Sequence, residues 1–457
     1  CSSISTSSCA SHDSEGIIQS LCHQGEVDKA MDMLSDMHSP PHDNTYIALL
    51  RACYRSKGIS HAKRVLNLMK KHYTSVSGLV GDYLVVTLAK CLALEDAWKV
   101  FCILPRKTVF SWTAIISAYV ACGRAEEALC MRKHMNLDGV EPNSYTFVSF
   151  VKACGISRDL EQGKELHDEI RRKGLASDVF VGSTLVSMYG KCGAVTEAEV
   201  VFSSLCQRNI VSWNAMLATY VEQGEGEKTL SLFRQMQEDD VGIDRHTLLF
   251  SLQACMALSG DGKFIAVDRR RYIHMILELA HALHADAKRS GFSSDVFVGS
   301  TLVSIYGRLG AISEAVHVFC ALSKRNVVSW TAIISAYVEV NQAEKALQLF
   351  WQMQTEVVSP DKLAAVAVFQ ACCSLAENSE IIINSRSNKS IALEIGQALR
   401  DDTCTKDFSS DVFLNSSLLN MYSKCGAIME AECMFGSLSQ PNIVLWSTML
   451  TLYVEQE

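Results

Sequence analysis

Two residues of the chain have the spacing of half a catalytic metal site. His167 and Glu169 match the His-x-Glu half of a zinc-dependent nucleobase deaminase, in which the histidine binds zinc and the glutamate transfers protons. That chemistry also needs a Pro-Cys-x-x-Cys string to complete the metal site, and the sequence contains none. His284 stands at the corresponding place of a later repeat. We therefore predict a structural role for His167 and Glu169, in the repeat core or on the surface.

No other string predicts catalysis or a cofactor. Residues 260–264 contain two glycines and a lysine, but they lack the spacing and the Ser or Thr of a phosphate-binding loop. The chain has 18 cysteines, and no two are spaced as Cys-x-x-Cys, the usual spacing of zinc ligands. Several recur beside apolar residues, which predicts buried thiols in a reducing compartment. These are Cys53, Cys154, Cys255 and Cys372. We predict a protein that is not an enzyme and holds no metal or cofactor.

The composition favours helices and limits the kinds of partner. Among 457 residues only 6 are proline, and 48% are hydrophobic. A net charge of −8 argues against coating nucleic acid by bulk charge, so any such binding requires a local groove. The longest nearly uncharged apolar stretch, 363–376, is too short to cross a bilayer, and no membrane partner is predicted. A Ser-rich opening, residues 1–10, is typical of the remnant of a transit peptide. Because the chain starts at Cys1 and stops inside a repeat, we expect a fragment at both ends.

The sequence repeats itself with a long period. Similar segments surround Trp112, Trp213, Trp330 and Trp446, which are 101, 117 and 116 residues apart. Each period holds three related repeats, of 35, 35 and 31 residues in the first cycle. The middle repeats of the later cycles are longer, with insertions near 259–275 and 377–391. The predicted repeats are 11–42, 43–77, 78–108, 109–143, 144–178, 179–209, 210–244, 245–295, 296–326, 327–361, 362–411 and 412–442, with a partial repeat from 443.

Each repeat has the pattern of two helices. Apolar residues recur at helical spacing on both sides of a central glycine, which is the usual left-handed stop of a helix. These glycines are Gly123, Gly193, Gly224, Gly310 and Gly426. One hairpin cannot bury its apolar face alone, but stacked hairpins form a continuous core. The fold class predicted is all-α, a superhelical solenoid of helix-turn-helix repeats similar to tetratricopeptide arrays.

The repeats resemble those of pentatricopeptide-repeat proteins. The resemblance rests on the length of 35 residues, the central glycine and endings such as residues 139–143, Gly-Val-Glu-Pro-Asn. The cycle of 35, 35 and 31 residues and the string Met-Tyr-x-Lys-Cys-Gly, at 188–193 and 421–426, resemble the plant-type PLS subclass. Residues 109–457 match that subclass best, and residues 11–108 read as degenerate repeats. The resemblance implies a mitochondrial or chloroplast protein that binds single-stranded organellar RNA, mostly to specify cytidine-to-uridine editing.

The resemblance also implies which residues read bases: the fifth and the last residue of each repeat, one base per repeat. The polar pairs are Thr113/Asn143, Ser183/Asn209, Asn214/Asp244, Ser300/Asn326, Thr331/Asp361 and Ser416/Asn442. The middle repeats have an apolar fifth residue, in the pairs Val148/Asp178, Leu249/Asp295 and Val366/Asp411, and are expected to read weakly or not at all. The implied RNA is A-x-A-U-x-A-G-x-A, where x marks the middle repeats.

Helix capping is the alternative interpretation of the final residues, because Asn and Asp are favoured N-caps. Capping alone does not explain why the fifth residue is polar in some repeats and apolar in others. It also does not explain a final Asn or Asp where a hydroxyl three residues later offers a closer cap. Those hydroxyls are Ser111, Thr146, Ser212 and Ser329.

Two further positions are candidates for RNA contact. The resemblance implies that the second residue sandwiches bases, and ordinary contact between repeats is the alternative. These residues are Phe110, Phe180, Val211, Phe297, Val328 and Phe413. The short repeats carry a cation before their central turn, which predicts a phosphate-binding ladder or a solvated face. These cations are Lys90, Lys191, Arg308 and Lys424.

The function predicted is sequence-specific RNA binding that specifies editing sites or another RNA-processing event. A deaminase or another editing factor would act in trans or lie beyond Glu457. The alternative is a scaffold of helical repeats that binds peptides or proteins, as tetratricopeptide arrays do. The repeat cycle and the Asn or Asp at the repeat ends favour RNA.

Overall fold

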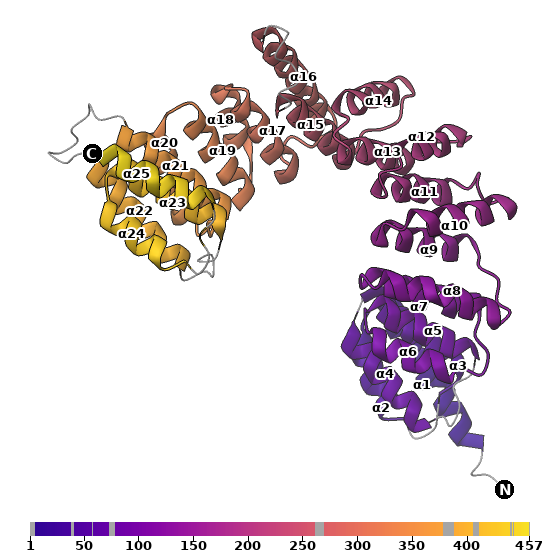
Figure 1. Cartoon of the computed structure of the whole chain (residues 1–457). Helices are drawn as coiled ribbons and strands as arrows, with labels where there is room; N and C mark the ends of the chain where they lie inside the picture. The colour runs from indigo at the N-terminus through magenta and orange to yellow at the C-terminus, as the bar shows by residue number, and fades with distance from the viewer. Residues whose placement is uncertain are drawn as a thin grey trace. The chain divides into compact units, whose positions relative to one another are not determined.

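The computed structural model describes residues 5–37, 41–56, 58–72, 78–260, 269–377, 388–404, 411–438, 441 and 443–456. These residues form twenty-five α-helices and no strand (Figure 1). Within residues 1–223 and within residues 224–457, the helices pair into hairpins, and successive hairpins stack. The predicted all-α fold of stacked helix-turn-helix repeats is confirmed.

The two helices of a repeat alternate along the chain. The first helices are α1 (Ser5–Gln24), α3 (Asp43–Ser56), α5 (Gly78–Lys90), α7 (Val109–Ala121), α9 (Ser144–Ser157), α11 (Val179–Lys191), α13 (Ile210–Glu222), α15 (Arg245–Gly260), α17 (Val296–Arg308), α19 (Val327–Glu339), α21 (Lys362–Glu377), α23 (Val412–Cys425) and α25 (Ile443–Gln456). The second helices are α2 (Val27–Ser35), α4 (Ile59–His72), α6 (Leu94–Ile103), α8 (Ala125–Leu137), α10 (Leu160–Arg172), α12 (Val195–Ser204), α14 (Gly226–Glu238), α16 (Arg269–Arg289), α18 (Ile312–Ala321), α20 (Ala343–Thr355), α22 (Asn388–Cys404) and α24 (Ile428–Gly436). From α7 onward, every first helix begins at the first residue of a predicted repeat.

The chain divides into two compact units, an N-terminal unit of residues 1–223 and a C-terminal unit of residues 224–457. In the N-terminal unit, α3, α5, α7, α9, α11 and α13 pack side by side in that order. In the C-terminal unit, α15, α17, α19, α21, α23 and α25 do the same. Each unit therefore has a layer made only of first helices, and residues at equivalent positions of that layer recur once per repeat.

A recurrent aromatic cluster holds each short repeat to the next. The Trp330 ring is fully buried and meets the Phe319 ring edge-on, with the ring centres 4.8 Å apart. The Arg325 guanidinium lies 4.8 Å from the centre of the Phe319 ring. Equivalent clusters form around Trp112 and Trp213. Edge-to-face rings and a cation over a ring both add to the energy of burial.

The turns inside the hairpins require glycine. Gly123 and Gly310 have φ of 76° and 74°, in the left-handed region that other residues rarely adopt. The other three predicted stop glycines also have positive φ. The left-handed helix stops predicted from the sequence are confirmed at all five positions.

The predicted insertions lie between the two helices of the long middle repeats. Residues 261–268 of the first insertion and residues 378–387 of the second lie outside the described residues. Part of the first insertion is helical, because α16 begins at Arg269 and has 21 residues, whereas the equivalent α10 has 13. Ala280 and Leu283 of α16 are buried, so the helix rejoins the repeat core.

None of the helices in the described part of the chain is both long enough and apolar enough to span a bilayer.

Candidate nucleic-acid interface

From repeat 78–108 to repeat 362–411, the final residue lies directly before the next first helix and caps it. Asn143, Asn209 and Asn326 accept a hydrogen bond from the backbone N–H three residues on, at 3.0, 3.0 and 2.9 Å. Asp244 and Asp361 do the same, both at 2.8 Å. The capping role weighed from the sequence is therefore present at these positions.

The hydroxyls three residues into these helices are not closer caps than the final residues, contrary to the expectation from the sequence. Ser329 is the third residue of α19, and its hydroxyl accepts from the backbone N–H of Asn326 at 3.1 Å, while Asn326 accepts from the Ser329 N–H. Thr146 and Asn143 form the same reciprocal capping box. The backbone N–H of Ser212 is capped by Asn209. Ser111 forms a capping box with Thr108, the final residue of repeat 78–108. These hydroxyls support the caps and do not replace them.

Capping uses only one of the two terminal atoms of a final Asn or Asp, so the second terminal atom points away from the helix. Because a backbone N–H can bond only to an acceptor, the amide oxygen of Asn326 faces the helix and its Nδ2 group is presented outward. Asp361 uses Oδ1 for the cap, and no described residue bonds to its Oδ2. A capping asparagine therefore presents a hydrogen-bond donor, and a capping aspartate presents an acceptor.

The structure brings three of the predicted pairs together. The Thr331 hydroxyl lies 3.2 Å from Asp361 Oδ1, and the Ser300 hydroxyl lies 3.3 Å from Asn326 Oδ1. Both hydroxyls also bond to the backbone carbonyl four residues earlier. Thr113 reaches its partner through one intermediate: its hydroxyl lies 2.7 Å from the Thr146 hydroxyl, which donates to Asn143 Oδ1 at 2.9 Å. The fifth and last residues of these repeats are thus neighbours, as the resemblance implies.

Of the other three pairs, only Ser183/Asn209 lies within a single compact unit and within the described residues. Ser183 is buried, and its hydroxyl donates to the Val179 carbonyl at 2.6 Å instead of to Asn209. Ser416 donates to the Val412 carbonyl at 2.8 Å, and Asn442 lies outside the described residues. Asn214 belongs to the N-terminal unit and is half-buried on α13, whereas Asp244 caps α15 in the C-terminal unit.

The second residues of the repeats are exposed. Phe110, Phe180, Val211, Phe297, Val328 and Phe413 all have between 52% and 71% of their surface exposed. Ordinary contact between repeats, the alternative raised above, does not account for side chains that are more than half exposed. The middle repeats carry exposed residues at the same position, Tyr145 and Leu363, which the sequence interpretation missed. Their spacing from the other second residues would have revealed them.

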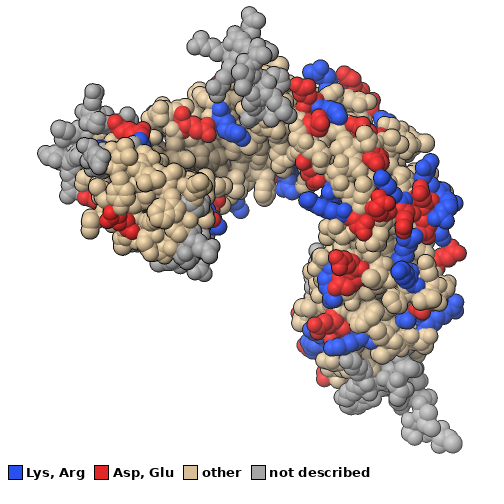
Figure 2. All heavy atoms as spheres, in the orientation of Figure 1, with Lys and Arg blue, Asp and Glu red and all other residues tan. Residues whose placement is uncertain are grey.

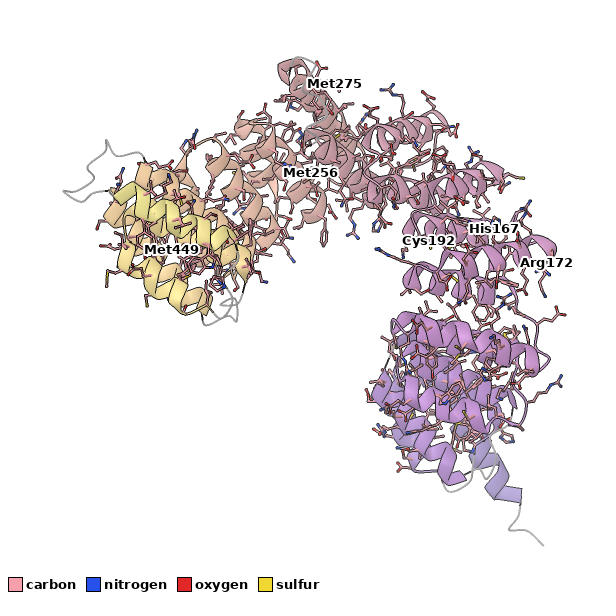
Figure 3. The ribbon with its side chains drawn as sticks, in the orientation of Figure 1. His167, Arg172, Cys192, Met256, Met275 and Met449 are labelled. Carbon is pink, nitrogen blue, oxygen red and sulfur yellow. The ribbon has the colours of Figure 1, made fainter. Side chains whose placement is uncertain are left out.

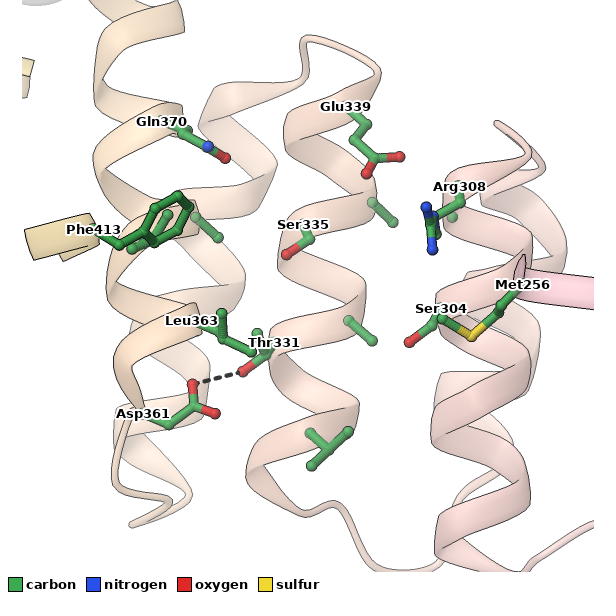
Figure 4. A pocket seen from close by; sticks show the side chains of 16 residues that line it. Met256, Ser304, Arg308, Thr331, Ser335, Glu339, Asp361, Leu363, Gln370 and Phe413 are labelled. Carbon is green, nitrogen blue, oxygen red and sulfur yellow. Dashed lines mark hydrogen bonds between the residues drawn. The ribbon is translucent and has the colours of Figure 1, made fainter. Parts of the chain in front are cut away.

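Fifth, last and second residues meet in the same pocket. A pocket of about 380 Å³ in the C-terminal unit is lined by Val328, Thr331 and Asp361 of one repeat, with Leu363 and Val366 of the next (Figure 4). A pocket of about 750 Å³ in the N-terminal unit is lined by the equivalent residues of the first complete cycle. Those residues are Phe110, Thr113, Asn143, Tyr145 and Val148. The site is therefore a repeating structure rather than a single cavity.

Two of the predicted cations line these pockets. Lys90 lines the N-terminal pocket, with its Nζ 5.5 Å from the centre of the Tyr54 ring, and Arg308 lines the C-terminal pocket. Lys191 is exposed and forms no ion pair within the described residues. Lys424 is different, because its Nζ lies 3.1 Å from Glu377 Oε1.

Several other charged side chains form ion pairs between neighbouring repeats. Lys63 Nζ lies 3.1 Å from Asp96 Oδ2, and Lys164 Nζ lies 3.5 Å from Glu197 Oε1. Figure 2 shows acidic and basic side chains mixed over the N-terminal unit rather than separated by sign. This distribution agrees with the expectation that phosphate binding must be local.

The residues that resemble half of a deaminase site have structural partners. His167 lies on α10 (Figure 3). Its Nδ1 lies 2.8 Å from the Tyr189 hydroxyl, and burial lowers the pKa of His167. Glu169 forms an ion pair with Arg132 of the preceding repeat. Within the described residues, no three His, Cys, Asp or Glu side chains are grouped so that they could hold a metal ion.

The equivalent histidine makes stability depend on pH. His284 Nδ1 lies 3.1 Å from the Tyr306 hydroxyl, and burial lowers the pKa of His284 from 6.5 to about 4. Between these two pH values the unfolded chain binds a proton that the folded chain does not, so the free energy of unfolding falls as the pH decreases from 6.5 to about 4. In His284→Gln this contribution is absent. Urea unfolding across this pH range should show a shallower decline for the variant, and parallel curves would contradict the prediction.

Comparisons with known proteins agree with the repeats. A model described as "PPR repeat" matches residues 16–39, 44–73, 145–175, 183–210 and 211–241, and one described as "PPR repeat family" matches residues 107–156 and 325–374. Together they cover about half of the chain. The matches fall on both compact units.

Curated relatives come from Arabidopsis thaliana. Pentatricopeptide repeat-containing protein At1g15510, chloroplastic, is 30% identical over 98% of this chain and 48% of its own length. At4g18520, chloroplastic, is 32% identical over 90% of this chain and 61% of its own length. At3g09040, mitochondrial, is 31% identical over 81% of this chain and 33% of its own length. The chain thus spans between a third and three-fifths of these relatives. The predicted location in a mitochondrion or chloroplast is confirmed by relatives that belong to these organelles.

Among solved structures, the maize pentatricopeptide repeat protein PPR10 is similar over 97% of this chain and 71% of its own, with a TM-score of 0.55 and 18% identity. This similarity concerns the fold.

Proposed function

The chain belongs to the pentatricopeptide-repeat family, and from that premise we propose that it binds single-stranded RNA with one base held in each repeat. The observation that carries the proposal is the pocket in which an exposed apolar second residue, a polar fifth residue and a capping last residue meet. Val328, Thr331 and Asp361 are one such set. A base needs a flat apolar contact for its face and a polar contact for its edge, and this pocket offers both.

The caps supply a physical reason for base preference. Asn326 presents its Nδ2 donor, which suits the N1 acceptor of adenine. Asp361 presents the Oδ2 acceptor, which suits the N1–H of guanine. Both assignments agree with the preferences that the family resemblance implies. The implied RNA over residues 109–442 is therefore A-x-A-U-x-A-G-x-A, numbered here as bases one to nine.

The finer role is also part of the proposal. The three-repeat cycle of 35, 35 and 31 residues supports the plant-type PLS subclass, whose members mostly specify sites of cytidine-to-uridine editing. We propose that the chain acts without catalysis of its own, as the part that selects the site of editing or other RNA processing. A deaminase or another editing factor would then act on the bound RNA.

A single substitution tests the base reading. Asp361→Asn keeps the cap, since Asn and Asp cap helices equally well, but it changes the outward acceptor into a donor. The preference at the seventh base should move from guanine to adenine, with each mismatch costing about 1–3 kcal/mol by analogy with protein–DNA sites. Both proteins are titrated against both RNAs at one salt concentration.

The control for this test is Asp239→Asn, which makes the same chemical change at an exposed position beyond α14. It should leave both affinities unchanged. If Asp361→Asn keeps the guanine preference, Asp361 is only a cap. If neither RNA binds and a peptide library does, the protein-binding alternative holds instead.

A further inference from the structure

The middle repeats end in an aspartate, and in two of them a cation of the same repeat reaches that aspartate. Lys362, the first residue of repeat 362–411, places its Nζ 2.8 Å from Oδ2 of Asp411, the last residue. The other carboxylate oxygen, Oδ1, accepts from the backbone N–H groups of Phe413 and Leu414, both at 3.1 Å. The cap and the ion pair thus engage both oxygens of Asp411.

The preceding middle repeat repeats this arrangement. In repeat 245–295 the first residue, Arg245, places Nη1 3.8 Å from Asp295 Oδ2. Asp295 Oδ1 accepts from the N–H groups of Phe297 and Val298 at 3.0 and 3.1 Å. The Arg245 guanidinium also lies 5.3 Å from the centre of the exposed Phe297 ring. The cation therefore covers both the carboxylate edge and part of an apolar face.

The first middle repeat lacks this cation. Repeat 144–178 begins with Ser144, and Asp178 Oδ1 accepts from the N–H groups of Phe180 and Val181 at 2.9 and 3.1 Å. Within the described part of the chain, no cation pairs with Asp178. Its Oδ2 is therefore an open acceptor, like Oδ2 of Asp361 in the repeat proposed to read guanine.

The fifth residue, which would share the edge of the base with the last residue, is apolar in the middle repeats. In repeat 362–411 it is Val366, which lines the pocket beside Asp361 together with Leu363 and Phe413 (Figure 4). The fifth residue of repeat 144–178 is Val148, which is equally apolar. Of the fifth and last residues, only the last aspartate has a polar group that could distinguish one base from another. Whether a cation already pairs with its carboxylate therefore decides whether the repeat selects its base.

We propose that the first residue of a middle repeat determines whether that repeat selects its base. Lys362 and Arg245 close the last carboxylate of their own repeats, so the fifth and eighth bases are held by stacking without selection. Repeat 144–178 has an open carboxylate and selects a base with a ring N–H donor, guanine or uracil, at the second position. This inference rests on the proposed RNA binding, and it separates the three middle repeats, which an apolar fifth residue alone would make equivalent.

Reciprocal substitutions in the full chain test the proposal. In wild type, RNAs with guanine or uracil as the second base should bind about tenfold more tightly than those with adenine or cytosine, the order of one hydrogen bond to a charged group. Changing the eighth base should have less than about a twofold effect. Lys362→Met, which removes the cation and every donor, should create the tenfold preference at the eighth base. Ser144→Lys should abolish the preference for guanine or uracil at the second base.

The control and the opposing outcomes are distinct. Lys324→Met removes an exposed lysine away from the pocket and should create no preference. If Lys362→Met weakens binding equally for the four RNAs that differ only in the eighth base, Lys362 binds phosphate and the proposal is wrong. If wild type does not discriminate at the second base, the apolar fifth residue alone silences these repeats. If wild type binds no RNA with selectivity at the seventh base, the proposed function fails and this inference fails with it.

A measurement without RNA tests the ion pair itself. The hydrogen bond from Lys362 holds the pKa of the Asp411 carboxyl below its usual value. NMR titration of Asp411 should therefore give a higher pKa in Lys362→Met than in wild type. An unchanged pKa would remove the basis of the proposal even if the RNA affinities shifted.

Discussion

Trp330→Ala lowers the free energy of unfolding of the C-terminal unit by about 3–5 kcal/mol, the usual cost of removing a large buried aromatic side chain. The Trp330 side chain is fully buried. Its removal leaves a cavity against Phe319 and takes the second ring from beneath Arg325. Because repeats are stabilised by their neighbours, the loss should spread over the hairpins on both sides.

The chain contains its own control for this prediction. Trp446 stands at the same repeat position and meets Phe435 edge-on with ring centres 4.7 Å apart, but it is 54% exposed. Trp446→Ala should cost about 1 kcal/mol or less. Hydrogen exchange of the α17 to α20 amides, with urea unfolding, measures the difference. Equal losses in the two variants would show that burial of Trp330 is not what holds these repeats together.

The repeat fold could be predicted because its causes are local. The apolar spacing within each helix and the glycine of each turn lie within one repeat, so the sequence predicts them without knowledge of distant contacts. Gly123 and Gly310 adopt the left-handed conformation that their position after a helix indicates. Trp112, Trp213 and Trp330 stand at the same position of the period, and all three are buried.

The candidate site was predicted less completely because part of it depends on contacts between repeats. From the sequence, capping and base reading are alternative roles for Asn326. In the structure the cap uses Oδ1 of Asn326 and leaves its Nδ2 for a ligand. The ion pair of Lys362 with Asp411 joins residues 49 positions apart across an insertion, and no repeat spacing predicts it. Ser183 has the same type and position as Ser300, but only Ser300 reaches its partner asparagine.

Exposed aromatic residues are expected to contribute a large part of the RNA affinity. Phe110 and Phe180 are 69% and 71% exposed at the second position of two repeats in the N-terminal unit. Stacking of a base on an aromatic ring contributes about 1–3 kcal/mol, and separate sites add. The double variant Phe110→Ala/Phe180→Ala should therefore lose about 2–6 kcal/mol of binding free energy, roughly a 30-fold to 20,000-fold loss of affinity.

The same variant should fold as well as wild type, since exposed side chains contribute little to stability, within about 0.5 kcal/mol each. This combination separates base stacking from a structural role, because a ring that packed between repeats would lower both affinity and stability. Leu137→Ala/Val200→Ala is the matched control, with two apolar side chains on second helices that are 83% and 68% exposed. It should leave RNA affinity unchanged. If the control and the phenylalanine variant bind RNA equally well at one salt concentration, the second residues do not hold bases, and the interface must be sought on another face of the repeats.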